Sequence, residues 1–240
     1  MHEQLEYDEE FHPPSAIRVA RRALVLASVA CRGSIESDAG KLGAEELRQR
    51  ILPWLVELGT DIELESHERE LIAQPLGKLD RKNAINATWK SEGLVVLAWA
   101  LRFGELPSFC VQCDPPRVAN EVGLLAPVQE TCLDTPRLRD ADEIEAWTDY
   151  YLTLHWRLRL LESHPGQMDF VDCVNRVMWG PVTLEGFDLV ENDISDDGIR
   201  IDLISEDRRR ALISIAQERH QAFNWLLGFE ELYSHVTTDT

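Results

Sequence analysis

The sequence predicts a mainly α-helical protein, a single globular helical domain with one small β-hairpin near residues 187–203. Apolar residues recur at spacings of three and four over most of the chain, which is typical of helices with one buried face. Gly and Pro fall mostly between these stretches, where helices are expected to end. Only beyond residue 187 does the apolar period change to two, which is the period of a strand.

Two helices are expected near the N-terminus. Residues 16–31 contain neither Gly nor Pro and follow Ser15, a residue type that favours the N-cap position. Residues 44–58 precede Gly59, which suits a C-cap. Pro53 lies inside this second stretch. Because proline costs about 3 kcal/mol in a helix interior, we expect a kink there or two shorter helices.

Two more helices are expected before residue 104. Residues 66–73 form a short helical stretch that stops before Pro75. Residues 89–103 contain an unbroken apolar run, 94–101, which leaves no polar face. A helix that is apolar all round is buried, so this one is predicted to be the central core helix.

The following region is less regular. Residues 105–137 are rich in Pro and Cys, and only one short helix, 116–125, is expected there. Residues 140–161 then carry a wide apolar stripe at helical spacing. This stripe predicts a second long helix that is largely buried.

The predicted hairpin precedes a last helix. Asp197-Gly198 is a preferred hairpin turn, and the run 199–203 after it alternates between apolar and polar residues. Ser205 suits the N-cap of the last helix, and Glu206 and Asp207 carry the charge that a helix N-terminus favours.

The two ends of the chain are expected to lie outside the folded domain. Residues 1–14 are acidic and end in Pro13-Pro14, which is typical of a flexible arm. Residues 15–233 are expected to form the single domain. Residues 234–240 are mostly polar and are expected to be a flexible tail.

The charge balance restricts the partners. There are 43 acidic and 24 basic residues, which give a net charge of −19. Such a surface repels phosphates and anionic lipid, so we expect no nucleic acid and no membrane as partner. No secretory signal and no apolar run long enough to span a membrane is seen, so a cytoplasmic location is expected. The acidity is expected to serve solubility or to attract a basic protein.

Two metal-site motifs begin and then fail. His67-Glu68 starts like a zinc-protease motif, but Leu71 stands where the second His is needed, so a helix surface is expected. Asp193-x-Ser195-x-Asp197-Gly198 copies the first half of a calcium loop. Ile204 stands at its twelfth position and cannot supply the bidentate carboxylate, so a hairpin loop is the favoured interpretation.

The cysteines leave one further alternative. Cys110 and Cys113 have the spacing of half a zinc site or of a redox pair, and Cys132 offers a third thiolate. No second pair and no obvious fourth ligand follow, so reduced thiols are favoured over zinc or redox chemistry. The sequence predicts no catalytic residue, no metal site and no cofactor.

A set of polar residues is embedded in the apolar helices. Buried charge is costly unless it is paired, so these residues are expected to meet one another. They form either a closed network of ion pairs and hydrogen bonds, or a pocket that could bind an anion or run acid–base chemistry. The set consists of Glu92, His155, Arg157, Arg159, Glu218, Arg219, His220 and Asn224.

At these residues the sequence resembles a bacterial family, the domain of unknown function 4272. The resemblance spans about residues 15–230 and places three blocks in the family's order, the last being the most specific. Lys90 stands where Arg is more often expected, and residues 105–137 match nothing in the family that can be placed. The resemblance supports the helical fold and implies no catalytic or ligand residue. The blocks are Trp89-Lys90-Ser91-Glu92 running into Trp99-Ala100-Leu101 and Leu106-Pro107, Tyr151-x-x-x-His155-Trp156-Arg157, and Glu218-Arg219-His220-Gln221-Ala222-Phe223-Asn224-Trp225-Leu226.

Three functions are compatible with these observations. A non-catalytic binding or protein-interaction domain is favoured, because no reactive constellation is complete. The first alternative is an acidic inhibitor or immunity-type protein that neutralises a basic partner. The second is a small-molecule enzyme, which requires four side chains to line one open pocket: Glu92, His155, Glu218 and Arg219.

Overall fold

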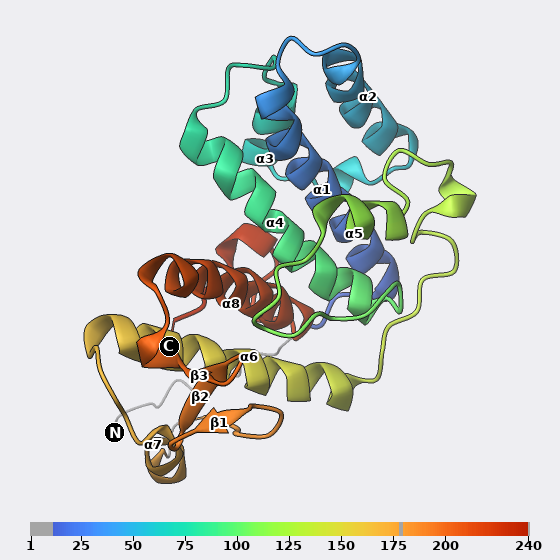
Figure 1. Ribbon diagram of the computed structural model, residues 1–240. Helices are drawn as coiled ribbons and strands as arrows, with labels where there is room; N and C mark the ends of the chain where they lie inside the picture. The colour runs from blue at the N-terminus through green and yellow to red at the C-terminus, as the bar shows by residue number, and fades with distance from the viewer. Residues whose placement is uncertain (1–11, 178–179, 240) are drawn as a thin grey trace, which may run out of the picture.

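The computed structural model describes residues 12–177 and 180–239 (Figure 1). Within these residues the chain forms eight α-helices and one small antiparallel sheet, which confirms the mainly α fold with a small β element. Most of the predicted flexible arm, residues 1–11, lies outside the described residues.

The first four helices follow the apolar pattern closely, with two differences. α2 continues through Pro53 as one helix, so two separate helices do not form there. α4 begins eight residues before the predicted start, because Asp80 caps it: its Oδ1 accepts from the backbone N–H of Asn83 at 2.8 Å. The bounds are α1 Ala16–Ser34, α2 Ala44–Glu57, α3 Ser66–Ala73 and α4 Arg81–Ala100.

The later helices include one that the sequence pattern did not predict, α7. The last helix begins where expected, because the Oγ of Ser205 accepts from the backbone N–H of Arg208 at 3.3 Å. The bounds are α5 Pro115–Glu121, α6 Ala141–Ser163, α7 Phe170–Arg176 and α8 Glu206–Leu226.

The sheet contains the predicted hairpin and one additional strand. Its order is β1 (Leu189–Val190), β2 (Asp193–Asp196) and β3 (Ile199–Arg200), with Leu189 opposite Ile194 and Ser195 opposite Arg200. Asp197 and Gly198 both have positive φ, as a tight two-residue hairpin turn requires. The β1–β2 turn also has positive φ at two non-glycine residues, Glu191 and Asn192, which is a weaker signal in a sequence.

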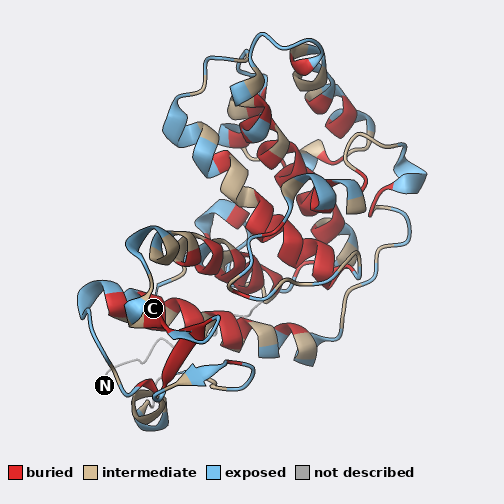
Figure 2. Ribbon diagram, viewed as in Figure 1, coloured by how far each residue is buried: buried red, intermediate tan, exposed pale blue. Residues whose placement is uncertain are grey.

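The core is a stack of helices. α4 packs against α1 and against α8, and α8 packs against α6, with the sheet and α7 at the end of the molecule beyond α6 (Figure 1). Buried residues follow α1, α4 and the facing sides of α6 and α8, as Figure 2 shows. The apolar run of α4 is buried throughout, which agrees with the predicted central helix.

α1 and α4 approach most closely at a glycine. A Cβ on Gly33 would lie 2.7 Å from the carbonyl oxygen of Ala84 and from the Cβ of Ala87. These atoms belong to the α4 backbone and to a short side chain, neither of which can turn aside. Gly33 therefore fixes how near the central helix lies to α1.

The segment after α8 packs on this helix. Val236 is buried, and the Nδ2 of Asn224 donates to the carbonyl oxygen of Thr237 at 3.1 Å. None of the helices in the described ranges is long and apolar enough to cross a lipid bilayer.

Candidate functional site

The central ion pair joins α4 to α8. Glu92 and Arg219 have no exposed side-chain surface, and the Nη2 of Arg219 lies 2.7 Å from the Oε2 of Glu92. The Nε of Arg219 donates to the same oxygen at 2.8 Å. A buried charge survives only where its partners satisfy it, and here both charges are satisfied inside the protein.

This pair also holds the Pro- and Cys-rich segment on the core. The Nη1 of Arg219 donates to the carbonyl oxygen of Pro107 and to the hydroxyl of Tyr151, both at 2.8 Å. Its Nη2 donates to the carbonyl oxygen of Val111 at 2.8 Å, and the Oε1 of Glu92 accepts from the backbone N–H of Cys113 at 2.9 Å. Three polar atoms of the pair, Nη1 and Nη2 of Arg219 and Oε1 of Glu92, therefore attach this segment to the core.

A second sealed pair joins α6 to the sheet. The guanidinium of Arg157 binds the carboxylate of Asp193 in a bidentate arrangement, and neither side chain is exposed. The Nε of Arg157 donates to the Oδ1 of Asp193 at 2.7 Å, and its Nη2 donates to the Oδ2 at 2.5 Å. Asp193 is the first residue of the calcium-like fragment. Its carboxylate is engaged by Arg157 and by the backbone N–H of Ile194, which agrees with a hairpin rather than an ion-binding loop.

Two members of the predicted set lie elsewhere. Arg159 is on the outer side of α6, 59% exposed, and lies 3.7 Å from Glu162. Glu218 pairs with Lys90, in the middle of α4, at 2.9 Å. The four side chains that acid–base chemistry would require are therefore not brought into one open pocket.

His155 of α6 and His220 of α8 meet in the interior. Their Nδ1 atoms lie 3.2 Å apart, so one imidazole donates and the other accepts. Burial lowers the pKa of His155 to about 4, with a smaller effect from Arg159, and burial and the neighbouring His155 lower the pKa of His220 to about 3. Both rings are neutral at pH 7.

His220 and Asn224, one turn apart on α8, form part of the lining of a pocket between α6, α8 and the C-terminal segment. The pocket has a volume of about 470 Å³, within the range of small-molecule sites. Its apolar lining comes from Leu152, Pro181, Leu227 and Phe229, and the other residues that line it are Glu145, Thr148, Asp149, Gly180, Thr237 and Asp239.

Three residues give this pocket acceptor atoms. Asn224 uses its Nδ2 on Thr237, and its Oδ1 has no partner among the residues described here. The Oγ1 of Thr148 donates to the carbonyl oxygen of Ile144 at 2.9 Å and keeps its lone pairs. The Nε2 of His220 likewise has no partner in residues 12–177 and 180–239, and neither it nor the Oδ1 of Asn224 is enclosed by protein.

Carboxylates stand around the same pocket. In the described part of the chain no basic side chain forms an ion pair with Glu145, Asp149 or Asp239, and no Lys or Arg lines the pocket. Burial and the nearby Glu145 raise the pKa of Asp149. The pocket therefore combines neutral acceptors deep between the helices with unpaired negative charge.

The sequence of residues 2–170, more than half of the chain, matches the family described as Domain of unknown function (DUF4272). The chain belongs to this family. The matched residues include two of the three blocks on which the resemblance rests, and they end before α8, so the block from Glu218 to Leu226 lies outside the match. Neither the curated proteins nor the solved structures contain a significant match.

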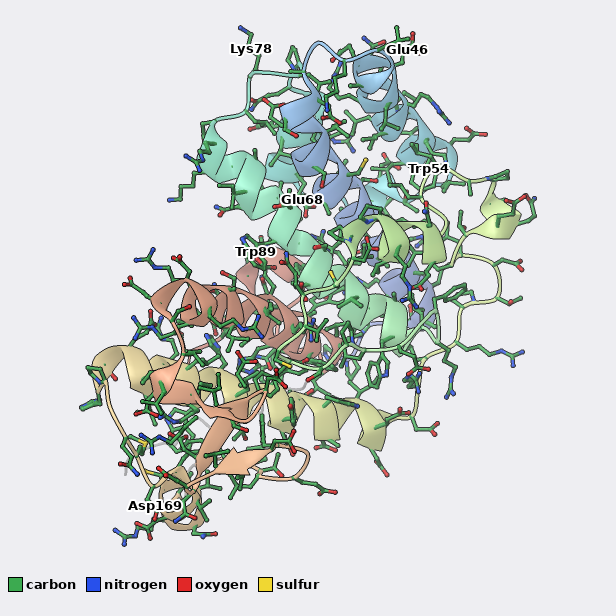
Figure 3. All side chains as sticks on the ribbon, in the orientation of Figure 1. Glu46, Trp54, Glu68, Lys78, Trp89 and Asp169 are labelled. Carbon is green, nitrogen blue, oxygen red and sulfur yellow. The ribbon has the colours of Figure 1, made fainter. Side chains whose placement is uncertain are left out.

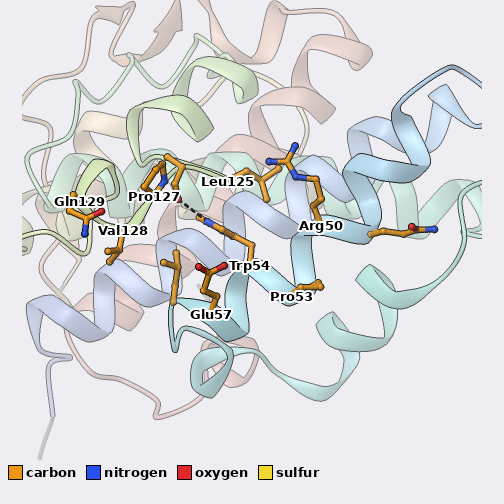
Figure 4. A pocket seen from close by; sticks show the side chains of 11 residues that line it. Arg50, Pro53, Trp54, Glu57, Leu125, Pro127, Val128 and Gln129 are labelled. Carbon is orange, nitrogen blue, oxygen red and sulfur yellow. Dashed lines mark hydrogen bonds between the residues drawn. The ribbon is translucent and has the colours of Figure 1, made fainter.

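A larger hollow of this DUF4272 chain lies at the opposite end, between α2 and residues 125–129 (Figure 4). Its volume is about 750 Å³. The indole Nε1 of Trp54 donates to the carbonyl oxygen of Ala126 at 2.8 Å, so the main buried polar group there is already satisfied.

The cysteine fragments do not assemble. Cys113 is buried, and burial raises its pKa to about 12, which suppresses the thiolate that metal binding or redox chemistry needs. Cys132 lies elsewhere, with its Sγ donating to the carbonyl oxygen of Ala20 at 3.4 Å. Within the described ranges, no group of three or more His, Cys, Asp or Glu side chains is placed to hold a metal ion.

Sequence reasoning missed several polar residues. Glu68 was expected on a helix surface, which is wrong: it is buried and accepts from the Nη1 of Arg22 at 2.9 Å. Thr148 and Asp149 were counted as parts of an apolar helix, although they line the pocket. The signal that could have found them is their place on the turn of α6 that follows Glu145, because i, i+3 and i+4 share one face.

Proposed function

We propose that this protein is a non-catalytic binding domain and that its ligand occupies the pocket between α6 and α8. The observation that carries the proposal is the contrast in hydrogen bonding. The polar atoms of Glu92 and Arg219 are paired inside the protein, whereas His220 and Asn224 present unpartnered atoms to an open pocket.

Several properties of the pocket support binding. Its volume suits a small organic molecule, and its walls are apolar with a few convergent polar atoms, which is the usual composition of ligand sites. The Nε2 of His220 and the Oδ1 of Asn224 have no partner within the described residues, and a ligand that donates to them supplies the hydrogen bonds that the protein does not.

The same geometry argues against catalysis at this place. An acid–base reaction needs a group that titrates near the working pH, whereas His220 stays neutral well below pH 7. The carboxylate and guanidinium of Glu92 and Arg219 are enclosed and have no access to a substrate.

A screen of small molecules by ligand-observed NMR tests the proposal. We expect compounds that bind the native protein, that remain chemically unchanged, and that lose binding in Leu152→Trp, where the larger side chain fills the pocket. Equal binding to the native protein and to Leu152→Trp would place the site elsewhere. Conversion of a bound compound would overturn the non-catalytic assignment.

A further inference from the structure

The hydrogen-bonding pattern of the pocket selects a class of ligand. Three neutral groups, Asn224, Thr148 and His220, line the pocket, and each has an oxygen or nitrogen atom that can accept from a ligand. Asn224 donates one of its two amide hydrogens to Thr237, and its Oδ1 has no partner within the described residues, while Thr148 donates its hydroxyl proton to Ile144. A ligand that satisfies the Oδ1 of Asn224 and the Oγ1 of Thr148 must carry N–H or O–H donors.

His220 can also accept a hydrogen bond from a ligand. Its Nδ1 is 3.2 Å from the Nδ1 of His155, and the two rings can share the single proton of that contact in either direction. When His220 carries the proton on Nδ1, its Nε2 accepts from the pocket. The buried pair thus lets the pocket present a third acceptor without placing a charge in the interior.

The charge around the pocket has one sign. Glu145, Asp149 and Asp239 line it, and no ion pair neutralises them within the part of the chain that the structure describes. His220 and Asn224, whose unpartnered acceptors face the same pocket, are only 2% and 5% exposed, so the carboxylates share the pocket with largely buried polar residues. Anions are excluded, and cations are attracted.

We infer that the ligand is a small organic cation, a protonated amine or guanidinium compound with an apolar body. The inference rests on the proposed function. The cationic head donates to Asn224 Oδ1, Thr148 Oγ1 and His220 Nε2, and the carboxylates compensate its charge. The apolar body packs on Leu152, Pro181 and Leu227.

Isothermal titration of the full chain with three compounds of one shape tests the class. The probes are 2-phenylethylammonium, the neutral 2-phenylethanol and the anionic 3-phenylpropionate. We expect the ammonium compound to bind at least tenfold more tightly than the alcohol, and the carboxylate not to bind. If the alcohol or the carboxylate binds as tightly in the native protein and fails in Leu152→Trp, the pocket functions but the cationic class is wrong.

Paired charge variants separate local contacts from the overall charge of the protein. Glu145→Gln should weaken the ammonium compound about threefold, because it removes one carboxylate at the pocket. Glu46→Gln makes the same change on an exposed residue of α2, at the end of the molecule away from α6 and α8 (Figure 3), and should leave affinity unchanged. An equal loss of affinity in both variants would show only a general attraction between the acidic protein and the cation, and would overturn the proposed site.

A lysine-containing peptide distinguishes the source of the cation. The pocket is closed on several sides by α6, α8 and the C-terminal segment, so we expect the free amine to bind more tightly than the peptide. Tighter binding of the peptide would assign the pocket to a protein side chain and overturn the small-molecule assignment. Ammonium binding that survives intact in Leu152→Trp would overturn both this inference and the proposed function.

Discussion

The Glu92–Arg219 pair and the pocket that contains His220 and Asn224 are built on the same turns of α8, yet their polar atoms are used differently. In the pair, each donor and acceptor is matched inside the protein, and the result is attachment of a loop to the core. In the pocket, acceptors are left open beside unpaired carboxylates such as Asp149. On these turns of α8, the polar residues whose atoms are matched hold the structure together, and the residues with open acceptors form the candidate site.

The largest expected effect comes from breaking the Glu92–Arg219 ion pair. Arg219→Met leaves the carboxylate of Glu92 buried without a counter-charge and frees the carbonyls that Arg219 binds, so we expect a loss of about 3–5 kcal/mol in the free energy of unfolding. Urea denaturation followed by tryptophan fluorescence measures it. Arg159→Met is the matched control on the exposed side of α6 and should change stability by less than about 0.5 kcal/mol. A similar loss in both variants would contradict the structural role.

The next largest expected effect is a loss of stability at low pH, which His155 and His220 cause. The folded-state pKa values of His155 and His220 are about 4 and about 3, below the ordinary value of about 6.5 for an unfolded chain. At pH values between the folded-state and the unfolded-state pKa values of these histidines, the unfolded chain binds protons that the folded protein does not. The stability is therefore full above pH 6.5 and is lost as the pH falls toward 4.

Between pH 6.5 and pH 5 this loss should reach about 2–4 kcal/mol for the pair. Asp149 acts in the opposite direction, because its raised pKa favours the folded state on acidification. Urea denaturation at a series of pH values measures the slope. The double variant His155→Gln with His220→Gln should flatten the slope over this range, and an unchanged slope would assign it to other groups.

Double replacements sharpen the comparison between the two sealed pairs. Arg157→Met with Asp193→Leu removes both charges together, and few other hydrogen bonds depend on them. Glu92→Leu with Arg219→Met also deprives several loop carbonyls of their donor. We expect the second double variant to be less stable than the first by about 2 kcal/mol. Chemical denaturation of the two proteins side by side decides this, and the reverse order would show that the loop is held by other contacts.

The smallest expected effect concerns Asp149. Its carboxylate lies near Glu145 without a cationic partner, so Asp149→Asn should leave stability unchanged or raise it by up to about 0.5 kcal/mol. Thermal denaturation at pH 7 measures it. A loss of more than 1 kcal/mol would mean that Asp149 holds structure and would weaken its assignment to the pocket.

The sequence pattern was sufficient for the long helices α1, α4, α6 and α8 because their apolar stripes are long, and it failed for the short helix α7. It also identified some of the buried polar residues, such as Glu92 and Arg219, and missed others, such as Arg22 and Arg32. It placed Arg159 with Arg157, although residues two apart on a helix point to opposite sides, so only one of them can face the interior.

Partners were harder to predict than burial. Asp193, which pairs with Arg157, comes from the sheet far along the chain, and nothing local in the sequence specifies that contact. The pocket depends on how α6, α8 and the C-terminal segment are placed relative to one another. Such placement is set by packing, which a periodic pattern does not encode.

The protonation state of the His220 ring decides whether the pocket presents this residue as an acceptor to a cationic ligand. A long-range ¹H–¹⁵N NMR spectrum of the histidine rings at pH 7, recorded with and without 2-phenylethylammonium, reports the protonation of each nitrogen. We predict that His155 and His220 are both neutral. We also predict that the bound ammonium compound shifts the resonance of the Nε2 of His220, while the Nδ1 of His220 carries the proton. A charged His155 or His220 at pH 7, or an Nε2 of His220 that does not respond when the compound binds, would contradict it.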